Sequence, residues 1–271
     1  MERLRRTFFV NVRTAVIFTA FMLAGFAAAG EVDFGAALAK GVALLDDSRY
    51  EESLKVFSGL LERAPDDGML HYYIGRNYQY MRRFDKAIEH LRRATELNPR
   101  HANSFCYLGY AMASKGDELK NSGVINKAKG LKLQMEAKGP LTKALELEPR
   151  NACANTGLAR ADIFFRNWDE ARKKCETALE TEPGRTTAMI YLGWALFGLG
   201  REEEGAKWLE KAGVMIPELD AWAHFTIGDI YADFGRWKEA LPYIEKALEI
   251  DPDYEGGRGK KRLEQARRKA G

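Results

Sequence analysis

Four histidines and three cysteines are the side chains of this 271-residue chain best suited to metal binding or nucleophilic chemistry. The histidines are His71, His90, His101 and His224. The cysteines are Cys106, Cys153 and Cys175. None of them forms a His-Glu-x-x-His or Cys-x-x-Cys motif, and no serine lies in a Gly-x-Ser-x-Gly context. Zinc sites and activated nucleophiles rely on such spacings. The sequence therefore predicts no metal, no cofactor and no enzyme activity.

The charge of the chain is concentrated at its N-terminus. The formal net charge is +3, and the first 29 residues hold Arg3, Arg5, Arg6 and Arg13 against the single Glu2. The rest of the chain therefore carries no net charge. Binding nucleic acid through a large surface requires an excess of lysine and arginine to neutralise phosphates. The composition thus argues against a nucleic-acid partner.

The N-terminal segment has the pattern of an export signal. Its basic start is followed by residues 14–30, which contain no charged side chain and end in three alanines and a glycine. Signal peptidases accept small residues of this kind. We expect residues 1–29 to be a cleaved signal peptide and the mature protein to be periplasmic or otherwise extracytoplasmic. The alternative is that residues 14–30 remain as an anchor in the inner membrane, which would be the protein's one membrane contact.

Two independent markers reveal an internal repeat. Six of the prolines are 34 or 35 residues apart except for one interval of 50, and a series of small residues shows the same intervals. The prolines are Pro65, Pro99, Pro149, Pro183, Pro217 and Pro252. The small residues are Gly41, Gly75, Gly109, Ala159, Gly193 and Gly228. Apolar stripes at helical spacing surround each small residue and end before each proline. This pattern indicates pairs of helices that cross closely at the small residue.

The repeat resembles the tetratricopeptide repeat, a helix–turn–helix unit. Residues 86–99, with the sequence KAIEHLRRATELNP, resemble the second helix of this family closely. The resemblance implies an all-α, right-handed α-solenoid of six repeats over residues 34–254, with a basic capping helix at residues 255–271. The repeats begin near Phe34, Gly68, Ala102, Ala152, Thr186 and Ala221. Because the family shares a binding surface rather than a reaction, the resemblance implies a non-catalytic protein.

The third repeat contains an insertion. It is 16 residues longer than its neighbours, and the extra residues lie within residues 115–138. This stretch combines lysines with aliphatic side chains, so we expect a longer helix pair with a solvated basic face. The alternative is a protruding amphipathic finger that contacts a partner or an anionic lipid surface. Gly139-Pro140 predicts a restart of the second helix, because proline is tolerated in a first turn.

Two of the cysteines fall on the first helices of neighbouring repeats. The resemblance places Cys106 and Cys153 on the concave wall, where they are candidates for a disulfide, and an extracytoplasmic location would permit one. The alternative is a pair of unbonded thiols, because a disulfide requires Cα atoms within about 7 Å of each other. Cys175 replaces an apolar position of a second helix, so we expect a buried thiol there.

First helices line the concave side of this family's superhelix, and here they carry many aromatic residues. We predict that a partner contacts this face and that Arg76 and Arg160 position its acidic or carbonyl groups, while part of the set packs between helices. The predicted binding residues are Tyr72, Arg76, Tyr80, Tyr107, Tyr110, Arg160, Tyr191, Trp194, Trp222 and Phe225. Some members of the family bind the C-terminal carboxylate of a peptide with a set of lysines and asparagines on this face, but the matching positions of this chain lack that set. An aromatic groove suits an extended or helical apolar peptide instead.

These patterns predict a periplasmic interaction scaffold that holds a protein or peptide partner during the assembly or organisation of an envelope complex. The alternative is a self-assembling structural protein. The first helix, with Leu38 and Val42, is apolar on both faces, although a terminal repeat should be polar outside. Burying one such side chain contributes about 1.5–3 kcal/mol, so two or three could sustain a weak homodimer through the first repeat.

We predict that residues 1–29 are removed on export. Intact mass spectrometry of the protein from its native host should then give Gly30 or a close neighbour as the N-terminal residue. A full-length species that is released only by detergent would show instead that the segment is an anchor.

Overall fold

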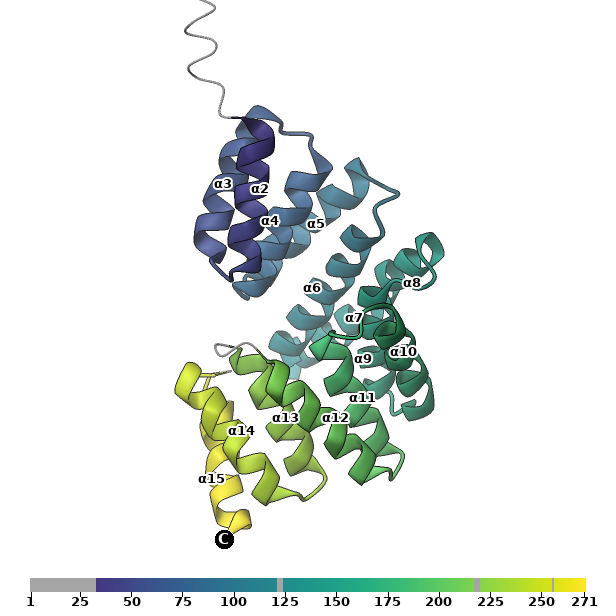
Figure 1. Ribbon diagram of the computed structural model, residues 1–271, viewed down its shortest axis with the longest axis vertical. Helices are drawn as coiled ribbons and strands as arrows, with labels where there is room; N and C mark the ends of the chain where they lie inside the picture. The colour runs from purple at the N-terminus through teal and green to yellow at the C-terminus, as the bar shows by residue number, and fades with distance from the viewer. Residues whose placement is uncertain (1–32, 121–123, 217–219, 255) are drawn as a thin grey trace, which may run out of the picture. The chain divides into compact units, whose positions relative to one another are not determined.

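The structure is a computed structural model that describes residues 33–120, 124–216, 220–254 and 256–271. The predicted signal or anchor at residues 1–29 lies outside these ranges. Every regular element within them is an α-helix, in agreement with the expected all-α repeat solenoid (Figure 1). No helix in the described ranges combines the length and the apolar character needed to cross a membrane.

The helices come in pairs that follow the sequence repeat. The first helices are α2 (Phe34–Asp46), α4 (Gly68–Tyr80), α6 (Ala102–Lys120), α9 (Ala152–Phe164), α11 (Thr186–Gly198) and α13 (Ala221–Asp233). The second helices are α3 (Tyr50–Arg63), α5 (Phe84–Leu97), α8 (Lys138–Leu147), α10 (Trp168–Thr181), α12 (Glu202–Met215) and α14 (Trp237–Ile250). Two further helices are α7 (Val124–Glu136), which belongs to the insertion, and α15 (Arg258–Ala270), which follows the last repeat.

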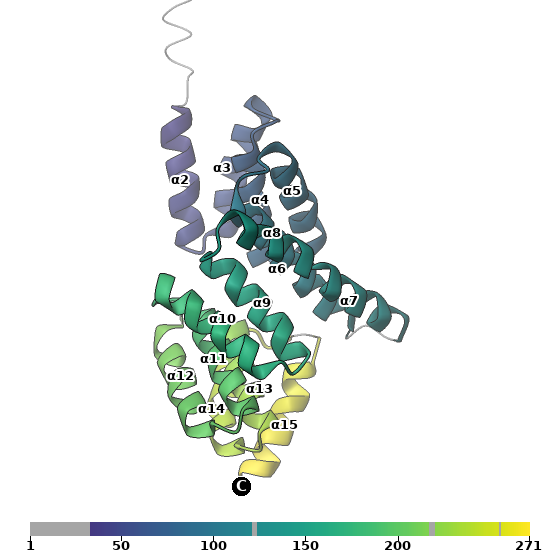
Figure 2. The same ribbon diagram turned by 90° about the vertical axis from the view of Figure 1, so that its right-hand side faces the viewer.

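The helices form two compact units, and the boundary between them falls between Pro65 and Asp66. The first unit contains the hairpin of α2 and α3, and the second contains α4 to α15. Within the second unit, each second helix also packs against the first helix of the next repeat, as α5 does on α6 and α10 does on α11 (Figures 1 and 2). Successive repeats therefore share one continuous stack of helices in that unit.

Short-range chemistry sets the ends of these helices. Asp67 begins α4 as an N-cap, because its carboxylate accepts hydrogen bonds from the backbone N–H groups of Met69 and Leu70. Asp33, Asn151 and Asp220 cap α2, α9 and α13 in the same way. The second helices end before a proline, since a following proline disfavours helical geometry. Asn98, which precedes Pro99, accordingly has φ −131° and ψ 75°.

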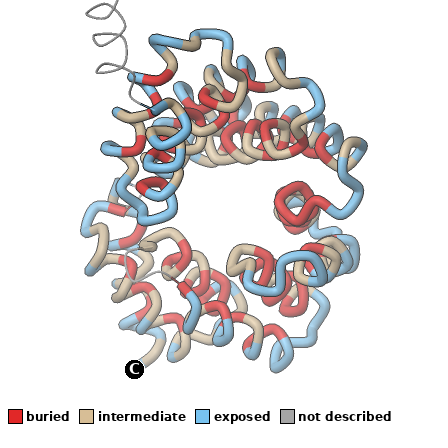
Figure 3. The backbone as a smooth tube through the Cα atoms, turned by 45° about the horizontal axis from the view of Figure 1, so that its top comes forward, coloured by how far each residue is buried: buried red, intermediate tan, exposed pale blue. Residues whose placement is uncertain are grey.

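Each helix pair crosses at one small residue. In four pairs the small residue of the first helix, a glycine, faces a large side chain of the second helix sixteen positions further along the chain. These pairs are Gly41–Phe57, Gly75–Leu91, Gly193–Leu209 and Gly228–Ile244. In the fourth repeat, Ala159 and Cys175 hold the matching positions and are fully buried. A Cβ built on Gly75 would lie only 2.5 Å from Leu91 Cγ, so a larger residue would force the helices apart. Buried positions recur in this way along the paired helices (Figure 3).

The insertion adds a helix between the two members of the third pair. Gly109 faces Leu141, which lies thirty-two positions later, because α6 continues to Lys120 and α7 returns beside it before α8 begins (Figure 2). The segment thus extends the helix pair instead of standing as an isolated finger. The lysines of the insertion differ in their exposure to solvent. Lys127, Lys129 and Lys132 are exposed, whereas Lys120 is half-buried.

The contact between α6 and α7 depends on two glycines. A Cβ built on Gly116 would lie 2.7 Å from the Gly130 carbonyl oxygen, and a Cβ on Gly130 would lie even closer to the Gly116 carbonyl oxygen. Backbone atoms cannot swing away as a flexible side chain can. The glycines therefore let the two helix backbones touch where α7 crosses α6.

We predict that Gly130→Ala destabilises the protein by about 1–3 kcal/mol, the typical cost of overpacking a tight contact. Alanine is the better helix former by about 1 kcal/mol, so a loss of stability would have to come from the backbone contact. The matched control is Gly139→Ala, because Gly139 is exposed in the first turn of α8 and a Cβ there would meet nothing within 4 Å. Urea unfolding should show no loss for the control. Equal stability of the two variants would contradict the close approach.

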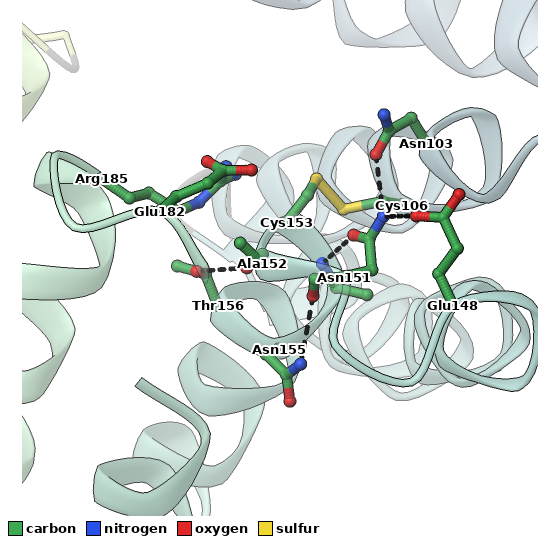
Figure 4. The surroundings of a disulfide bond; sticks show 11 residues. Asn103, Cys106, Glu148, Asn151, Ala152, Cys153, Asn155, Thr156, Glu182 and Arg185 are labelled. Atoms are coloured by element: carbon green, nitrogen blue, oxygen red, sulfur yellow. Dashed lines mark hydrogen bonds and ion pairs between the residues drawn. A yellow bond between two sulfur atoms is a disulfide. The ribbon is translucent and has the colours of Figure 1, made fainter. Parts of the chain in front are cut away.

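The disulfide predicted as one alternative is present in the structure. Cys106 of α6 and Cys153 of α9 are bonded, with their Cα atoms 6.1 Å apart (Figure 4). Both side chains are buried, so the bond lies inside the contact between the third and fourth repeats and not on an exposed wall. Beside it, the Asn151 side-chain amide donates to Asn103 Oδ1 at 3.0 Å and to Glu148 Oε2 at 2.7 Å. The third and fourth repeats are therefore joined covalently and by hydrogen bonds.

We predict that the disulfide contributes about 4 kcal/mol to stability, the chain-entropy value for a loop of its 47-residue separation. Peptide mapping without reductant should recover Cys106 and Cys153 in one linked fragment. The double variant Cys106→Ala/Cys153→Ala should unfold at a clearly lower urea concentration. Cys175→Ala is the control for trimming a buried sulfur, since Cys175 is a free and fully buried thiol. Two unlinked thiols in the oxidised protein would refute the bond.

Candidate partner-binding cleft

One position of the repeat recurs along the first helices of the second unit. It is the eighth residue after the start of each helix, and every side chain that occupies it is half-buried. The residues at this position are Arg76, Tyr110, Arg160, Trp194 and Asp229. We call the surface formed by them and their neighbours on the same helices the first-helix wall. It alternates aromatic and charged side chains, so it can bury apolar groups while keeping charges at fixed places.

A cleft of about 930 Å³ opens on this wall. It is bounded by the extended end of α6, by α7 to α9, by the start of α10, by α11 and α13, and by the residues that lead into α15. The aromatic residues that line it are Phe164, Phe165, Trp168, Tyr191, Trp194, Trp222, Phe225, Phe234 and Tyr254. All of the lining comes from the second unit. Its volume lies within the range of about 300–1,000 Å³ that is typical of ligand-binding clefts.

Half of the predicted binding residues line the cleft. Trp194 and Trp222 are half-buried and present part of their rings to it, whereas Tyr191 and Phe225 are only 2% and 3% exposed. The ring of Tyr191 meets the ring of Trp222 edge to face, with centroids 6.3 Å apart. Phe225 stacks on Tyr254 at 4.7 Å. The two tryptophans are thus the accessible side chains, and Tyr191 and Phe225 form the packed floor beneath them.

The other predicted residues lie on the first-helix wall outside the cleft. Tyr72 is 5% exposed and packs against His101 and Tyr107, with ring centroids 4.8 Å and 5.6 Å away. Its burial makes it a core residue, which corrects the expectation that it contacts a partner. Tyr107 and Tyr110 are half-buried, and Tyr80 is 45% exposed. These three keep a surface that a ligand can reach.

Arg160 lines the cleft but does not have a free charge. Its guanidinium donates to the carboxylate of Asp117, which comes from the extension of α6. Lys120 Nζ lies 2.8 Å from the same carboxylate, and the Gln134 side chain of α7 donates to it as well. Burial raises the pKa of Asp117, but the charges of Arg160 and Lys120 outweigh it and hold the pKa below its ordinary value. The expectation that Arg160 positions acidic groups of a ligand is therefore corrected, because its guanidinium is already paired with a carboxylate of the insertion.

The insertion also supplies cleft residues that the sequence did not predict. Lys120 Nζ lies 4.6 Å from the ring centroid of Phe164, and Lys138 Nζ lies 4.5 Å from that of Phe165. These phenylalanines end the helix α9 with 43% and 45% of their surface exposed. The sequence feature that could have identified this part of the cleft is the pair of adjacent phenylalanines at the end of a helix, because such a position is ordinarily polar.

The C-terminal helix closes the other end of the cleft. Asp229 pairs with Arg258 and with Arg262, each at 2.7 Å, and Arg262 also pairs with Asp233. The guanidinium of Arg258 lies 5.5 Å above the ring of Phe225. The capping helix therefore contributes charge and aromatic contacts to the site in addition to covering the last repeat. The basic composition of this segment allowed the capping helix to be predicted. Its ion pairs and its aromatic contact could not be predicted from the sequence.

The histidines pack between helices. His71 and His90 place their Nδ1 atoms 3.1 Å apart, and burial lowers the pKa of His90, with the nearby His71 adding to the effect. Burial also lowers the pKa of His224, whose ring lies 6.4 Å from that of Tyr243. Within the described ranges, no three His, Cys, Asp or Glu side chains gather as a metal site. The residues that line the cleft favour the binding of an apolar surface, and the cleft itself carries paired charges at its two ends.

Known proteins with this repeat match the chain in sequence. Patterns of the tetratricopeptide repeat match residues 68–101, 156–213 and 221–254. Tetratricopeptide repeat protein 37 of Xenopus laevis is 26% identical over 202 residues, which are 71% of this chain and 12% of that protein. The chain thus spans only a small part of the length of this relative.

Solved structures match the fold. A tetratricopeptide repeat protein from Parabacteroides merdae superposes with a TM-score of 0.60 at 16% identity, covering 89% of this chain and 86% of that one. PilW, a type IV pilus biogenesis factor, superposes with a TM-score of 0.56 at 16% identity, covering 87% and 99%. At such identities the likeness concerns the fold alone. The repeat in the sequence, the paired helices and these matches agree, and the chain belongs to the tetratricopeptide repeat family.

Proposed function

We propose that this protein is a non-catalytic scaffold that binds a segment of a partner protein in the cleft on its first-helix wall. The observation that carries the proposal is the pair of half-buried indoles, Trp194 and Trp222, in a cleft of about 930 Å³ with an aromatic floor. Large aromatic surface facing water is costly, and a concave site lined with it gains stability when a ligand covers it. Tryptophans at the centre of such a site are typical anchors of protein recognition.

The lining favours a particular class of ligand. Arg160 is paired with Asp117, and Asp229 is paired with Arg258 and Arg262, so none of these charges is left unpaired beside the aromatic surface between them. An apolar or amphipathic segment, extended or helical, would bury the most aromatic surface there at the least cost in desolvated charge. The partner therefore contributes two or more apolar side chains to the contact.

We place this activity in the cell envelope, where the scaffold would help to assemble or organise a complex. The support for the location is the uncharged stretch of residues 14–30 behind a basic start, which is typical of a signal peptide or, if uncleaved, of an inner-membrane anchor. The disulfide between Cys106 and Cys153 suits the same oxidising compartment. The likeness to PilW concerns the fold and adds nothing to the argument about location.

Self-association through the first repeat is the second candidate. Between α2 and α3 lies an open groove of about 510 Å³, in which small and apolar residues (Ala36, Ala37, Val56, Gly59 and Leu60) are flanked by the charged Asp33, Lys40, Lys55 and Arg63. Small residues allow a second helix to approach closely, so a copy of the chain could pack there. This candidate predicts that the mass measured by light scattering increases with protein concentration and that Val56→Glu, which places a charge in the groove, abolishes the increase.

The proposed cleft can be tested with a random peptide library displayed on phage and selected on the complete chain. We predict that the selected peptides bind Trp194→Ala and Trp222→Ala more weakly by about 2 kcal/mol or more, because each substitution removes a central anchor. The affinities can be measured by fluorescence polarisation of the labelled peptides.

The matched control is Trp208→Ala, because Trp208 is also half-buried but lies on the second helix α12, away from the cleft lining. Circular dichroism should show that all three variants keep their helices. An equal loss of affinity in the control, or a failure to select any peptide, would rule out the cleft as the binding site.

A further inference from the structure

Two histidines of the second repeat face each other across the contact between its helices. His71 of α4 and His90 of α5 place their Nδ1 atoms 3.1 Å apart, while their ring centroids are 5.1 Å apart. The nitrogens are much closer to each other than the centroids are, so they lie between the two rings. Both side chains are half-buried, and neither lines the aromatic cleft. Because 19 residues separate the two histidines along the chain, no motif of neighbouring residues indicates the pair.

The later repeats show what these two positions hold elsewhere in the chain. They are the fourth residue of the first helix and the seventh residue of the second helix. The fourth, fifth and sixth repeats place there Asn155 with Lys174, Met189 with Trp208, and His224 with Tyr243. In the sixth repeat the two rings still pack, with centroids 6.4 Å apart. Packing of the helix pair therefore does not require two histidines, and only the second of these four repeats has them.

The short contact between the nitrogens requires a hydrogen atom between them. A neutral imidazole has one donor and one acceptor nitrogen, so one ring carries its hydrogen on Nδ1 and the other ring accepts it. A divalent metal ion can take the place of this hydrogen. The donating ring then carries its hydrogen on Nε2 instead, and the Nδ1 lone pairs of both rings face the ion. Both rings stay neutral in this exchange, which is the form in which histidine binds metals.

The distance between the nitrogens fits two bonds to one metal ion. Bonds from imidazole nitrogen to a metal are about 2.0–2.1 Å long, so two such bonds to nitrogens 3.1 Å apart enclose an angle of about 100°. This angle lies between the value of about 90° in a square-planar site and the value of about 109° in a tetrahedral site. Imidazole is a preferred ligand of Cu²⁺, Ni²⁺ and Zn²⁺, whereas Mg²⁺ and Ca²⁺ prefer oxygen ligands.

The surroundings of the pair indicate an open site. The charged side chains that act on His90 are those of Glu89 and Lys86, which have opposite signs and are both exposed. No group of three His, Cys, Asp or Glu side chains suited to a metal forms among the described residues, so water would complete the coordination. Closed structural sites have four protein ligands. A site with two protein ligands binds its ion reversibly.

We propose that His71 and His90 form a reversible binding site for a divalent transition-metal ion of the copper, nickel and zinc group. Cu²⁺ binds most tightly, as it does to most nitrogen ligands. The ion bridges α4 and α5, which are the first helix pair of the second unit and have a neighbouring repeat on only one side within that unit. Because the unfolded chain does not hold the two rings together, the ion stabilises this pair. The site is independent of the proposed binding cleft.

The test is a titration of Cu²⁺ into the complete chain, purified without a polyhistidine tag and freed of metal with a chelator. Electron paramagnetic resonance of the one-to-one complex should show two coordinated imidazole nitrogens. In calorimetry, His71→Gln and His90→Tyr should each weaken Cu²⁺ binding by at least about tenfold, because one of the two protein ligands is lost. His90→Tyr recreates the pairing of histidine with tyrosine found in the sixth repeat, so the helices can still pack.

The matched control is His224→Gln, because His224 occupies the position of His71 in the sixth repeat but faces a tyrosine. It should bind Cu²⁺ as the wild type does, and circular dichroism should show that all variants keep their helices. A wild-type spectrum with fewer than two imidazole nitrogens would refute the site, and this result does not depend on the folding of any variant. Cu²⁺ affinities that are unchanged in His71→Gln and His90→Tyr, or lowered equally in His224→Gln, would refute it as well.

Discussion

The structure depends on one contact that is repeated in five of the six described helix pairs: a glycine of the first helix against a large side chain of the second. The glycine brings the two backbones so close that the partner side chain, Leu91 opposite Gly75 for example, is fully buried. The separation of sixteen positions between the two residues sets the length of the turn and the phase of both apolar stripes. The insertion respects this constraint, because it doubles the separation between Gly109 and Leu141 and leaves the crossing itself unchanged.

The same contact determines the binding surface. One side of each first helix packs against its partner helix. In every repeat of the second unit an adjacent side carries one recurring position, which is occupied by Arg76, Tyr110, Arg160, Trp194 and Asp229. Two additions to the plain repeat then modify this surface. The insertion brings Asp117 to Arg160, and the C-terminal helix brings Arg258 to Asp229, so both ends of the cleft carry neutralised pairs. Aromatic surface is left as the main attraction inside the cleft.

Much of the fold was predictable because it follows from local rules. Proline, capping residues and a small residue at fixed intervals indicate where helices end and where they cross, and α4 and α11 begin at the residues expected, Gly68 and Thr186. The roles of individual wall residues were harder to predict, because exposure depends on neighbours in other repeats. Tyr72 and Trp194 are both aromatic residues of first helices, yet Tyr72 is covered by His101 and Tyr107 whereas Trp194 faces the cleft. The pairing of Arg160 with Asp117 was hidden for the same reason, since it joins residues 43 positions apart.

The most direct test of the account is a map of the tryptophan side chains that a bound peptide protects from water. Oxidative labelling followed by mass spectrometry, carried out with and without a saturating selected peptide, reports on all of them in one experiment. The account predicts that labelling of Trp194 and Trp222 falls while labelling of Trp208, on α12 and outside the cleft, stays the same. Protection of Trp208 with unchanged labelling of Trp194 and Trp222 would place the partner on the second helices and contradict the account.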